Sequence, residues 1–200
     1  MLLGLGTGST ATHFIAGLAG REVTCIASSR ASAEQARGLG LRVLEELDRE
    51  CDLTVDGADE IDPELGLIKG RGGALFREKL LAVNSERFVV IADESKLVQR
   101  LGVGVLPVEV LPFLWRRTAQ HLADRGIAWQ LRGGESQPFL TDNGNLILDL
   151  TVQGGIEEPL RLAADLKLIP GVCEHGLFIG IAKAAIIGGP DGVRTIGSVS

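Results

Sequence analysis

Residues 56–79 read DGADEIDPELGLIKGRGGALFREK, and the interpretation of the whole chain starts from this stretch. Its charged residues alternate with glycines and short apolar pieces, unlike a continuous solvated face. Residues 53–55 read as a buried strand, so Asp56 is expected at the carboxyl end of that strand. Residues 67–68 form a second apolar piece, and Lys69 follows it in the equivalent position. The stretch therefore predicts charged groups at strand ends, with glycines that let the backbone approach a ligand.

A helix is expected over residues 74–83, directly after these glycines. Leu75, Glu78 and Ala82 share one face of that helix at i, i+3 and i+7 spacing. A carboxylate on this apolar face is partly desolvated, and desolvation tends to raise a carboxyl pKa toward that of a useful base. Glu78 is therefore a candidate general base. A glycine-rich loop with surface charges is the alternative, and composition alone favours it.

Short apolar runs alternate with helical segments over the first half of the chain. This alternation indicates a parallel sheet covered on both faces, in which ligands bind beyond the carboxyl ends of the strands. The loop after the first strand, Asp56 and the turn at residues 93–96 all fall on that edge, which predicts one site. Strands are expected at residues 2–6, 23–27, 42–44, 53–56 and 88–92, and helices at 11–18, 32–39 and 74–83.

The pattern changes after about residue 101 to the order β-α-β-β-α-β, which is typical of a ferredoxin-like unit. We therefore expect a doubly wound, mostly parallel, Rossmann-like α/β catalytic domain at residues 1–101 and 179–200. An inserted α+β ferredoxin-like lid domain is expected at residues 102–178. Strands are expected at residues 103–110, 127–131, 146–152, 172–178, 179–187 and 193–196, helices at 113–125 and 159–168, and a tight turn at 142–145.

The sequence GLGTGST at residues 4–10 offers glycines, three hydroxyl groups and a helix amino terminus, which together suit an anion. A dinucleotide fingerprint requires G-x-G-x-x-G, and position 9 is Ser. The second expected strand ends in Ala-Ser-Ser-Arg at residues 27–30, without the acidic residue that binds a ribose. No Gly-Lys-Ser/Thr of a Walker loop follows either. The phosphate of a sugar is favoured over a nucleotide cofactor.

Composition narrows the partners and the compartment. The formal net charge is −6 and aromatic residues make up 4%, which argues against a nucleic-acid or anionic-membrane partner. No apolar run approaches the roughly 18 residues of a membrane helix, and the start lacks a secretory signal pattern. Cys25, Cys51 and Cys173 form no CxxC pair, and their odd number suggests a reducing cytoplasm. Cys25 and Cys51 lie in or beside apolar segments and are expected to be buried free thiols.

Other chemistries are weakly supported. The acidic residues Asp59, Glu60 and Asp62 could hold a divalent cation, but Lys69 is a competing positive charge nearby. No G-x-S-x-G elbow of a serine hydrolase is present. His13, His121 and His175 are isolated, with no ligand spacing to one another or to a cysteine, and His13 and His121 are expected to be structural.

Four motifs occur together in one order: GLGTGSTA at residues 4–11, DGADEID at 56–62, KGRGGALFREK at 69–79 and IADESK at 91–96. With them, the chain from about Leu3 to Thr195 resembles the type A family of ribose-5-phosphate isomerases. The resemblance implies an enzyme of the pentose phosphate pathway that interconverts D-ribose 5-phosphate and D-ribulose 5-phosphate. It also implies no cofactor or metal, a small sugar phosphate as the ligand, and a homodimer or homotetramer.

Such an isomerase moves a proton between adjacent carbons through an enediol, and one base can carry both transfers. By resemblance, Glu78 is that base, and Asp56 and Lys69 assist ring opening, with Lys69 also countering the enediolate charge. Asp59 would orient hydroxyl groups and hold Lys69. The implied substrate contacts are Thr7, Gly8, Ser9, Thr10, Asp56, Gly57, Ala58, Asp59, Lys69, Gly70, Arg71, Gly72 and Lys96.

The sequence departs from the family at Arg71, where an all-glycine loop is common, so its side chain is expected to turn outward. Two rival functions share parts of the pattern. A non-catalytic sugar-phosphate sensor would keep the phosphate loop but could dispense with Glu78 and Lys69. A CoA-transferase-like enzyme would need a glutamate that forms a thioester and a longer chain. A ketopentose assay after incubation with ribose 5-phosphate separates the three.

Overall fold

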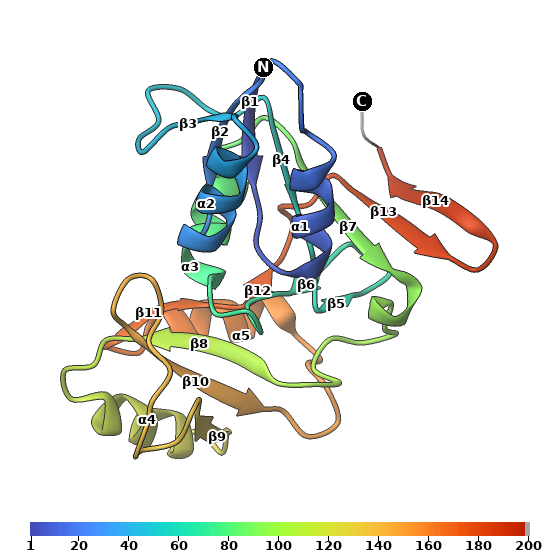
Figure 1. Ribbon diagram of the computed structural model, residues 1–200. Helices are drawn as coiled ribbons and strands as arrows, with labels where there is room; N and C mark the ends of the chain where they lie inside the picture. The colour runs from blue at the N-terminus through green and yellow to red at the C-terminus, as the bar shows by residue number, and fades with distance from the viewer. Residues whose placement is uncertain (199–200) are drawn as a thin grey trace. The chain divides into compact units, whose positions relative to one another are not determined.

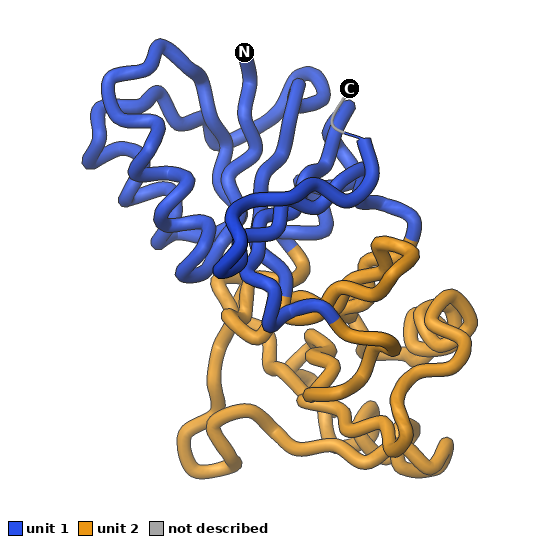
Figure 2. The backbone as a smooth tube through the Cα atoms, turned by 90° about the vertical axis from the view of Figure 1, so that its right-hand side faces the viewer, with its two compact units in different colours: residues 1–58, 77–97, 180–200 blue, residues 59–76, 98–179 orange. Residues whose placement is uncertain are grey.

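The computed structural model describes residues 1–198 and divides into two compact units (Figure 2). The first unit comprises residues 1–58, 77–97 and 180–200, and the second comprises 59–76 and 98–179. Residues 59–76 therefore group with the second unit, although the sequence places them within the 1–101 domain. The expected division into a catalytic domain (residues 1–101 and 179–200) and a lid domain (residues 102–178) stays a prediction.

The first unit is built on a seven-stranded sheet in the order β14-β13-β7-β4-β1-β2-β3 (Figure 1). All neighbouring strands are parallel except β13 and β14, so this is a mixed α/β fold with a mainly parallel central sheet. The strands are β1 (Leu2–Leu5), β2 (Thr24–Ala27), β3 (Arg42–Val43), β4 (Leu53–Asp56), β7 (Phe88–Asp93), β13 (Ala184–Gly189) and β14 (Gly192–Gly197).

The helices α1 (Ser9–Ala16) and α2 (Arg30–Gly38) lie side by side on one face of this sheet (Figure 1). The helix α3 (Leu75–Val83) precedes β7 in the chain, and the short 3₁₀ helix η1 (Glu94–Lys96) directly follows β7. Apolar side chains of β1, β2 and α1 form a buried core that includes Leu5, Ile15 and Cys25. This core anchors the carboxyl ends of the strands, where the expected site residues lie.

The second unit contains a four-stranded antiparallel sheet in the order β11-β8-β10-β9 and a three-stranded sheet β12-β6-β5. Along the chain the larger sheet follows the order β8-α4-β9-β10-α5-β11. A core of apolar side chains joins the two sheets, with Ile68 and Leu177 packing beside Leu106 and Leu148. The elements are β5 (Glu60–Ile61), β6 (Leu67–Ile68), β8 (Leu106–Val110), α4 (Trp115–Ala123), β9 (Ala128–Leu131), β10 (Leu146–Thr151), α5 (Pro159–Lys167), β11 (Val172–His175) and β12 (Leu177–Phe178).

The strand expected at residues 172–178 is in fact two strands in different sheets, divided at Gly176. The Gly176 N–H donates to the carbonyl of Pro107 at 2.8 Å, while its own carbonyl accepts from the Lys69 N–H at 2.9 Å. A Cβ at this position would lie 2.2 Å from the Lys69 carbonyl oxygen. The sequence prediction was wrong here because the division depends on these non-local partners. Residues 103–105 and 179–183 also lie outside strands.

The prediction that Cys25 and Cys51 are buried free thiols is confirmed. Burial raises the pKa of both thiols. Cys173 is only partly buried. None of the helices within residues 1–198 is long and apolar enough to cross a membrane.

A buried carboxylate, Glu109 on β8, organises the turn before β10. Its Oε1 accepts hydrogen bonds from the hydroxyl of Thr141 at 3.0 Å, the amide of Asn143 at 3.0 Å and the amide of Asn145 at 2.8 Å. Glu109 is fully buried, and these three donors replace the water that its Oε1 loses on folding, whereas its Oε2 is buried without a hydrogen-bond partner among residues 1–198. The DNGN turn is thereby tied to the middle of the sheet.

Replacing Glu109 by Ala is expected to destabilise the protein by about 1–3 kcal/mol, because buried donors lose their acceptor. Glu109→Gln keeps an acceptor oxygen in the same place and should cost less. Urea unfolding of the two variants and of the exposed control Glu157→Ala measures the difference. An Ala variant as stable as the wild type would contradict this account of the turn.

Candidate active site

The loop after β1 is tied to the end of β4 by the carboxylate of Asp56. Its Oδ1 accepts hydrogen bonds from the N–H of Thr7 at 3.0 Å and from the N–H of Gly57 at 2.7 Å. Asp56 is fully buried. A Cβ placed on Gly57 would lie 3.8 Å from Cβ of Thr10, so the two segments are in close contact. The first unit thus brings together four of the predicted site residues, Thr7, Thr10, Asp56 and Gly57.

The same loop forms the amino terminus of α1. Gly8 has φ 107°, a left-handed conformation that favours glycine, and the helix begins at Ser9. No side chain caps this terminus, so the first N–H groups of the helix have no side-chain acceptor there. Gly8 and Ser9 are exposed, and Thr7 and Thr10 are half-buried. The arrangement suits an anion, because the helix dipole and the free N–H groups favour negative charge.

Two serines that the sequence analysis did not select hold this loop from the side of α2. The hydroxyl of Ser28 lies 2.7 Å from that of Thr7 and donates to the carbonyl of Leu5 at 3.1 Å. The hydroxyl of Ser32 donates to the carbonyl of Gly6 at 2.7 Å. Both serines are buried. The sequence does contain a signal for Ser28, because two consecutive serines follow β2, which pairs with β1 in the sheet. In the sequence, this segment served only to show that an acidic residue for a ribose is missing.

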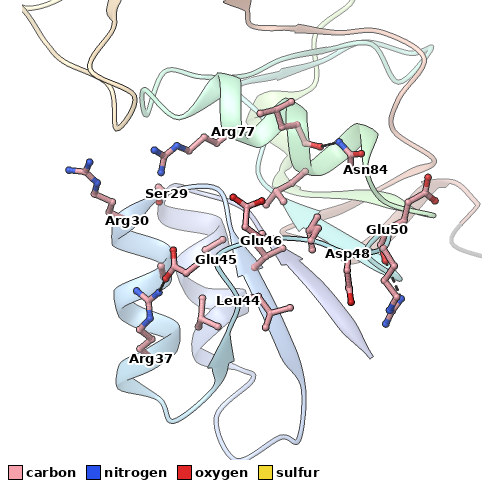
Figure 3. Close-up of a pocket in the computed structure, with 18 of the residues that line it drawn as sticks. Ser29, Arg30, Arg37, Leu44, Glu45, Glu46, Asp48, Glu50, Arg77 and Asn84 are labelled. Carbon is pink, nitrogen blue, oxygen red and sulfur yellow. Dashed lines mark hydrogen bonds and ion pairs between the residues drawn. The ribbon is translucent and has the colours of Figure 1, made fainter.

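Glu78 lies in the first turn of α3 and is 4% exposed. Leu75 and Ala82 on the same face are 0% and 2% exposed, which confirms the prediction that Glu78 shares a buried apolar face. The neighbouring residue Arg77 faces a hollow whose other wall carries Ser29 and Arg30 at the start of α2 (Figure 3). The first turn of α3 and the start of α2 therefore line one hollow of the first unit.

That hollow has a volume of about 880 Å³ and contains none of the predicted catalytic residues. Its walls carry charges of both signs, and Arg37 forms an ion pair with Glu45 across it (Figure 3). The chemistry is therefore expected at the loop after β1 and at Asp56, which this loop contacts, and not in the hollow.

Lys96 lies at the end of η1, where it is half-buried. Asp93 caps this short helix and accepts from the N–H of Ser95 at 2.9 Å and from its hydroxyl. The hydrogen bond from the Ser95 hydroxyl, with a smaller contribution from the charge of Lys96, lowers the pKa of Asp93. Asp93 is thus a negative partner that fixes the backbone carrying Lys96.

In the second unit, Asp59, Lys69 and the loop at residues 70–73 form another group. The Asp59 N–H donates to the carbonyl of Ile68 at 2.8 Å, and Oδ2 of Asp59 accepts from the Arg71 N–H at 2.9 Å. Lys69 is 2% exposed, and its Nζ lies 5.5 Å from the centre of the Phe178 ring. A lysine so deeply buried is unusual and indicates a specific role.

The side chain of Arg71 is bound to a carboxylate. Its Nη2 lies 2.6 Å from Oε1 of Glu60, and about a third of the side chain is exposed. Glu60 is buried and also accepts from the N–H groups of Gly102, Val103 and Gly104 at 2.7, 3.2 and 2.6 Å. The guanidinium of Arg71 thus completes the hydrogen bonding of this buried carboxylate. Arg71 is itself an exposed residue, and that its side chain turns away from the sugar stays a prediction.

The acidic residues that could have suggested a metal have separate partners. Asp59 and Glu60 bind the backbone and side chain of Arg71 as described, and Oδ1 of Asp62 accepts from the N–H groups of Glu64 and Gly66. Within residues 1–198, no three His, Cys, Asp or Glu side chains gather in a group that could hold a metal ion.

The mainly parallel α/β sheet carries at its carboxyl edge the loop of residues 6–10, named here the anion loop, and the buried carboxylate of Asp56. These features define a class of ligand-binding α/β proteins. Comparison with known proteins narrows this class. Residues 24–192 match the family model described as ribose 5-phosphate isomerase A (phosphoriboisomerase A). The chain belongs to the ribose-5-phosphate isomerase A family.

Relatives and solved structures agree with this assignment. Ribose-5-phosphate isomerase A of Rhodopseudomonas palustris (strain HaA2) is 50% identical over 211 residues, covering 98% of this chain and 90% of the relative. That of Roseiflexus sp. (strain RS-1) is 51% identical over 204 residues, covering 96% and 87%. The structure of ribose 5-phosphate isomerase A from Methanocaldococcus jannaschii has a TM-score of 0.93 at 36% identity, covering 99% of this chain and 91% of that one. A D-ribose-5-phosphate isomerase solved in complex with phospho-erythronic acid has a TM-score of 0.93 at 37% identity, with the same coverage.

Gly6→Ala is expected to disturb the loop, because the added Cβ would lie 2.0 Å from Oδ1 of Asp56. Either Asp56 or the loop must move, which breaks the bond to the Thr7 N–H. Binding of inorganic phosphate, measured by titration calorimetry, should weaken by about 10-fold or more, the loss of a charged hydrogen bond. Gly38→Ala is the matched control, since nothing lies within 4 Å of its added Cβ. Equal phosphate binding by the two variants would show that the loop does not need this contact.

Proposed function

We propose that the chain interconverts D-ribose 5-phosphate and D-ribulose 5-phosphate, as a step of the pentose phosphate pathway, and that Glu78 is the base. Membership of the ribose-5-phosphate isomerase A family is the observation that carries the proposal. The first unit supports it by burying the Glu78 carboxylate and by joining an anion loop to Asp56. The complex of a related enzyme with phospho-erythronic acid supports a sugar phosphate as the ligand.

In the proposed reaction, the Glu78 carboxylate takes the proton from C2 of the open-chain aldose. The electrons of that C–H bond form the C1–C2 double bond of an enediolate, and the negative charge moves to O1. The same proton returns from Glu78 to C1, O1 gains a proton and the hydroxyl on C2 loses one. One base on one face of the sugar therefore completes the exchange without an oxidant or reductant.

The other residues have supporting roles in the proposal. The first N–H groups of α1 and the hydroxyls of Thr7, Ser9 and Thr10 bind the phosphate, with Lys96 balancing its charge. Asp56 and Lys69 move protons among the oxygens during ring opening, and Lys69 offsets the enediolate charge. Asp59 orients hydroxyl groups of the sugar and holds Lys69. Backbone contacts come from Gly8, Gly57, Ala58, Gly70, Arg71 and Gly72.

We also propose that residues 102–178 act as a ferredoxin-like lid on a Rossmann-like catalytic domain of residues 1–101 and 179–200. The order β8-α4-β9-β10-α5-β11 and the antiparallel sheet support this description. A cytoplasmic homodimer or homotetramer without a cofactor completes the proposal and is supported by family membership alone.

Glu78→Gln tests the assignment of the base. The amide has the same shape but cannot accept the proton from carbon, so kcat should fall by about 10²–10⁴-fold. KM should change by no more than about three-fold, because the phosphate contacts stay in place. A coupled ketopentose assay with ribose 5-phosphate gives both constants.

Glu86→Gln is the matched control, because it removes an exposed carboxylate from the same unit. It should keep the wild-type kcat. A Glu78→Gln enzyme with near-normal kcat would show that another group carries the proton.

A further inference from the structure

We infer that Arg132, at the end of β9, is a positioning residue that holds the backbone of residues 70–71 for catalysis. The inference rests on the proposed function, in which Lys69 and the following glycine loop serve the sugar. It concerns a residue far away in the sequence, for which neither the motifs nor the resemblance gave a role.

The guanidinium of Arg132 is bound on two sides. Its Nη1 donates to the carbonyl of Gly70 at 3.1 Å and to the carbonyl of Arg71 at 2.9 Å. Its Nε donates to one carboxylate oxygen of Asp149 at 2.9 Å, and its Nη2 donates to the other. The carboxylate of Asp149 therefore orients the planar fork, and the fork directs its remaining donors at two successive carbonyls.

Three of these four contacts are partly buried, and the one to the Arg71 carbonyl is exposed. The side chains of Arg132 and Asp149 are 16% and 17% exposed. The ring of Phe139 covers the guanidinium, with 5.7 Å from Cζ to the ring centre, and a Cβ placed on Gly73 would lie 2.5 Å from the same ring. The partly buried charged hydrogen bonds to Asp149 and Gly70 are stronger in such surroundings than in water. One lysine ammonium cannot match the geometry of a fork that binds both a carboxylate and two carbonyls.

The loop itself needs external support. Gly70 and Gly73 have φ of 99° and 87°, and glycine backbone is free to adopt many other conformations. Arg71 is held at its N–H by Asp59 and at its carbonyl by Arg132. Loss of the contact to Arg132 would leave the segment after Lys69 held only by Asp59 and Glu60 at Arg71, with the carbonyls of Gly70 and Arg71 no longer fixed by Arg132. The proposed chemistry depends on the positions of Lys69 and Asp59.

A purely structural role is the competing explanation, because Arg132 and Asp149 also join neighbouring strands β9 and β10. The two explanations differ in what they predict for the folded enzyme. A structural ion pair affects unfolding, whereas a positioning residue lowers kcat in protein that remains folded.

The test compares Arg132→Ala, Arg132→Lys and Asp149→Asn with the control Arg161→Ala. Arg161 forms an exposed ion pair with Glu158 in the same unit, so its loss should leave activity unchanged. For Arg132→Ala, kcat for ribose 5-phosphate should fall by about 10–100-fold, the cost of a small misplacement of catalytic groups. The kcat values of Arg132→Lys and Asp149→Asn should lie between those of Arg132→Ala and the wild type. Millimolar guanidinium should restore part of the activity of Arg132→Ala and leave Arg161→Ala unaffected.

Hydrogen–deuterium exchange supplies a readout that does not depend on turnover. Amides of residues 70–73 should exchange faster in Arg132→Ala, while amides of β8 and β10 keep their wild-type protection. Wild-type kcat in folded Arg132→Ala, or equal loss of protection over the whole second unit, overturns the inference. If Arg132→Ala does not fold, the Lys and Asn variants decide the question by the same two measurements.

The two proposals fail in different ways. Wild-type protein that does not convert ribose 5-phosphate refutes the proposed function, and the exchange data alone then decide whether Arg132 holds the loop. Active wild-type protein together with a fully active, folded Arg132→Ala variant refutes only the role of Arg132.

Discussion

The hydrogen bonds of the Asp56 carboxylate are the constraint on which the arrangement of the first unit depends. One oxygen accepts from the Thr7 N–H and from the Gly57 N–H, so it joins the ends of two adjacent parallel strands. The contact is possible because residue 6 is glycine, since any side chain there would overlap the carboxylate. A buried carboxylate is costly unless it is hydrogen-bonded, and one of its two donors here, the Thr7 N–H, belongs to the backbone of the anion loop. The stability of the fold and the shape of the loop are therefore coupled.

Buried charged side chains are concentrated in residues 56–79. Asp56, Glu60, Lys69 and Glu78 are all at most 4% exposed, and all come from residues 56–79. Side chains of this kind are seldom buried in proteins because the loss of hydration must be offset by specific partners. Glu60 is offset by the Arg71 guanidinium and three consecutive backbone N–H groups, which explains its burial structurally. The sequence pattern does not distinguish the structural carboxylate Glu60 from the proposed base Glu78. Only the identity of their partners in the structure separates them.

Local and periodic features could be predicted from the sequence. The strands of the parallel sheet have apolar runs long enough to mark them, and the i, i+3, i+7 spacing correctly placed Glu78 on a buried face. Features that depend on long-range partners could not be predicted in this way. Gly176 divides one apolar run into two strands because its N–H and carbonyl bind different segments. Ser28 and Ser32 hold the anion loop by donating to the carbonyl groups of Leu5 and Gly6, and such contacts leave no periodic trace.

The glycine loop at residues 70–73 shows why a motif is incomplete without its surroundings. Glycines give a backbone the freedom to approach a ligand, but the same freedom makes the approach imprecise. In the second unit the imprecision is removed from outside, by Asp59 at one N–H, by Glu60 at the Arg71 side chain and by Arg132 at two carbonyls. Asp59 and Glu60 lie close by in the sequence, whereas Arg132 is 61 residues from Arg71. A motif defined by proximity in sequence therefore includes the groups that face the sugar in the proposed reaction and omits part of what holds them still.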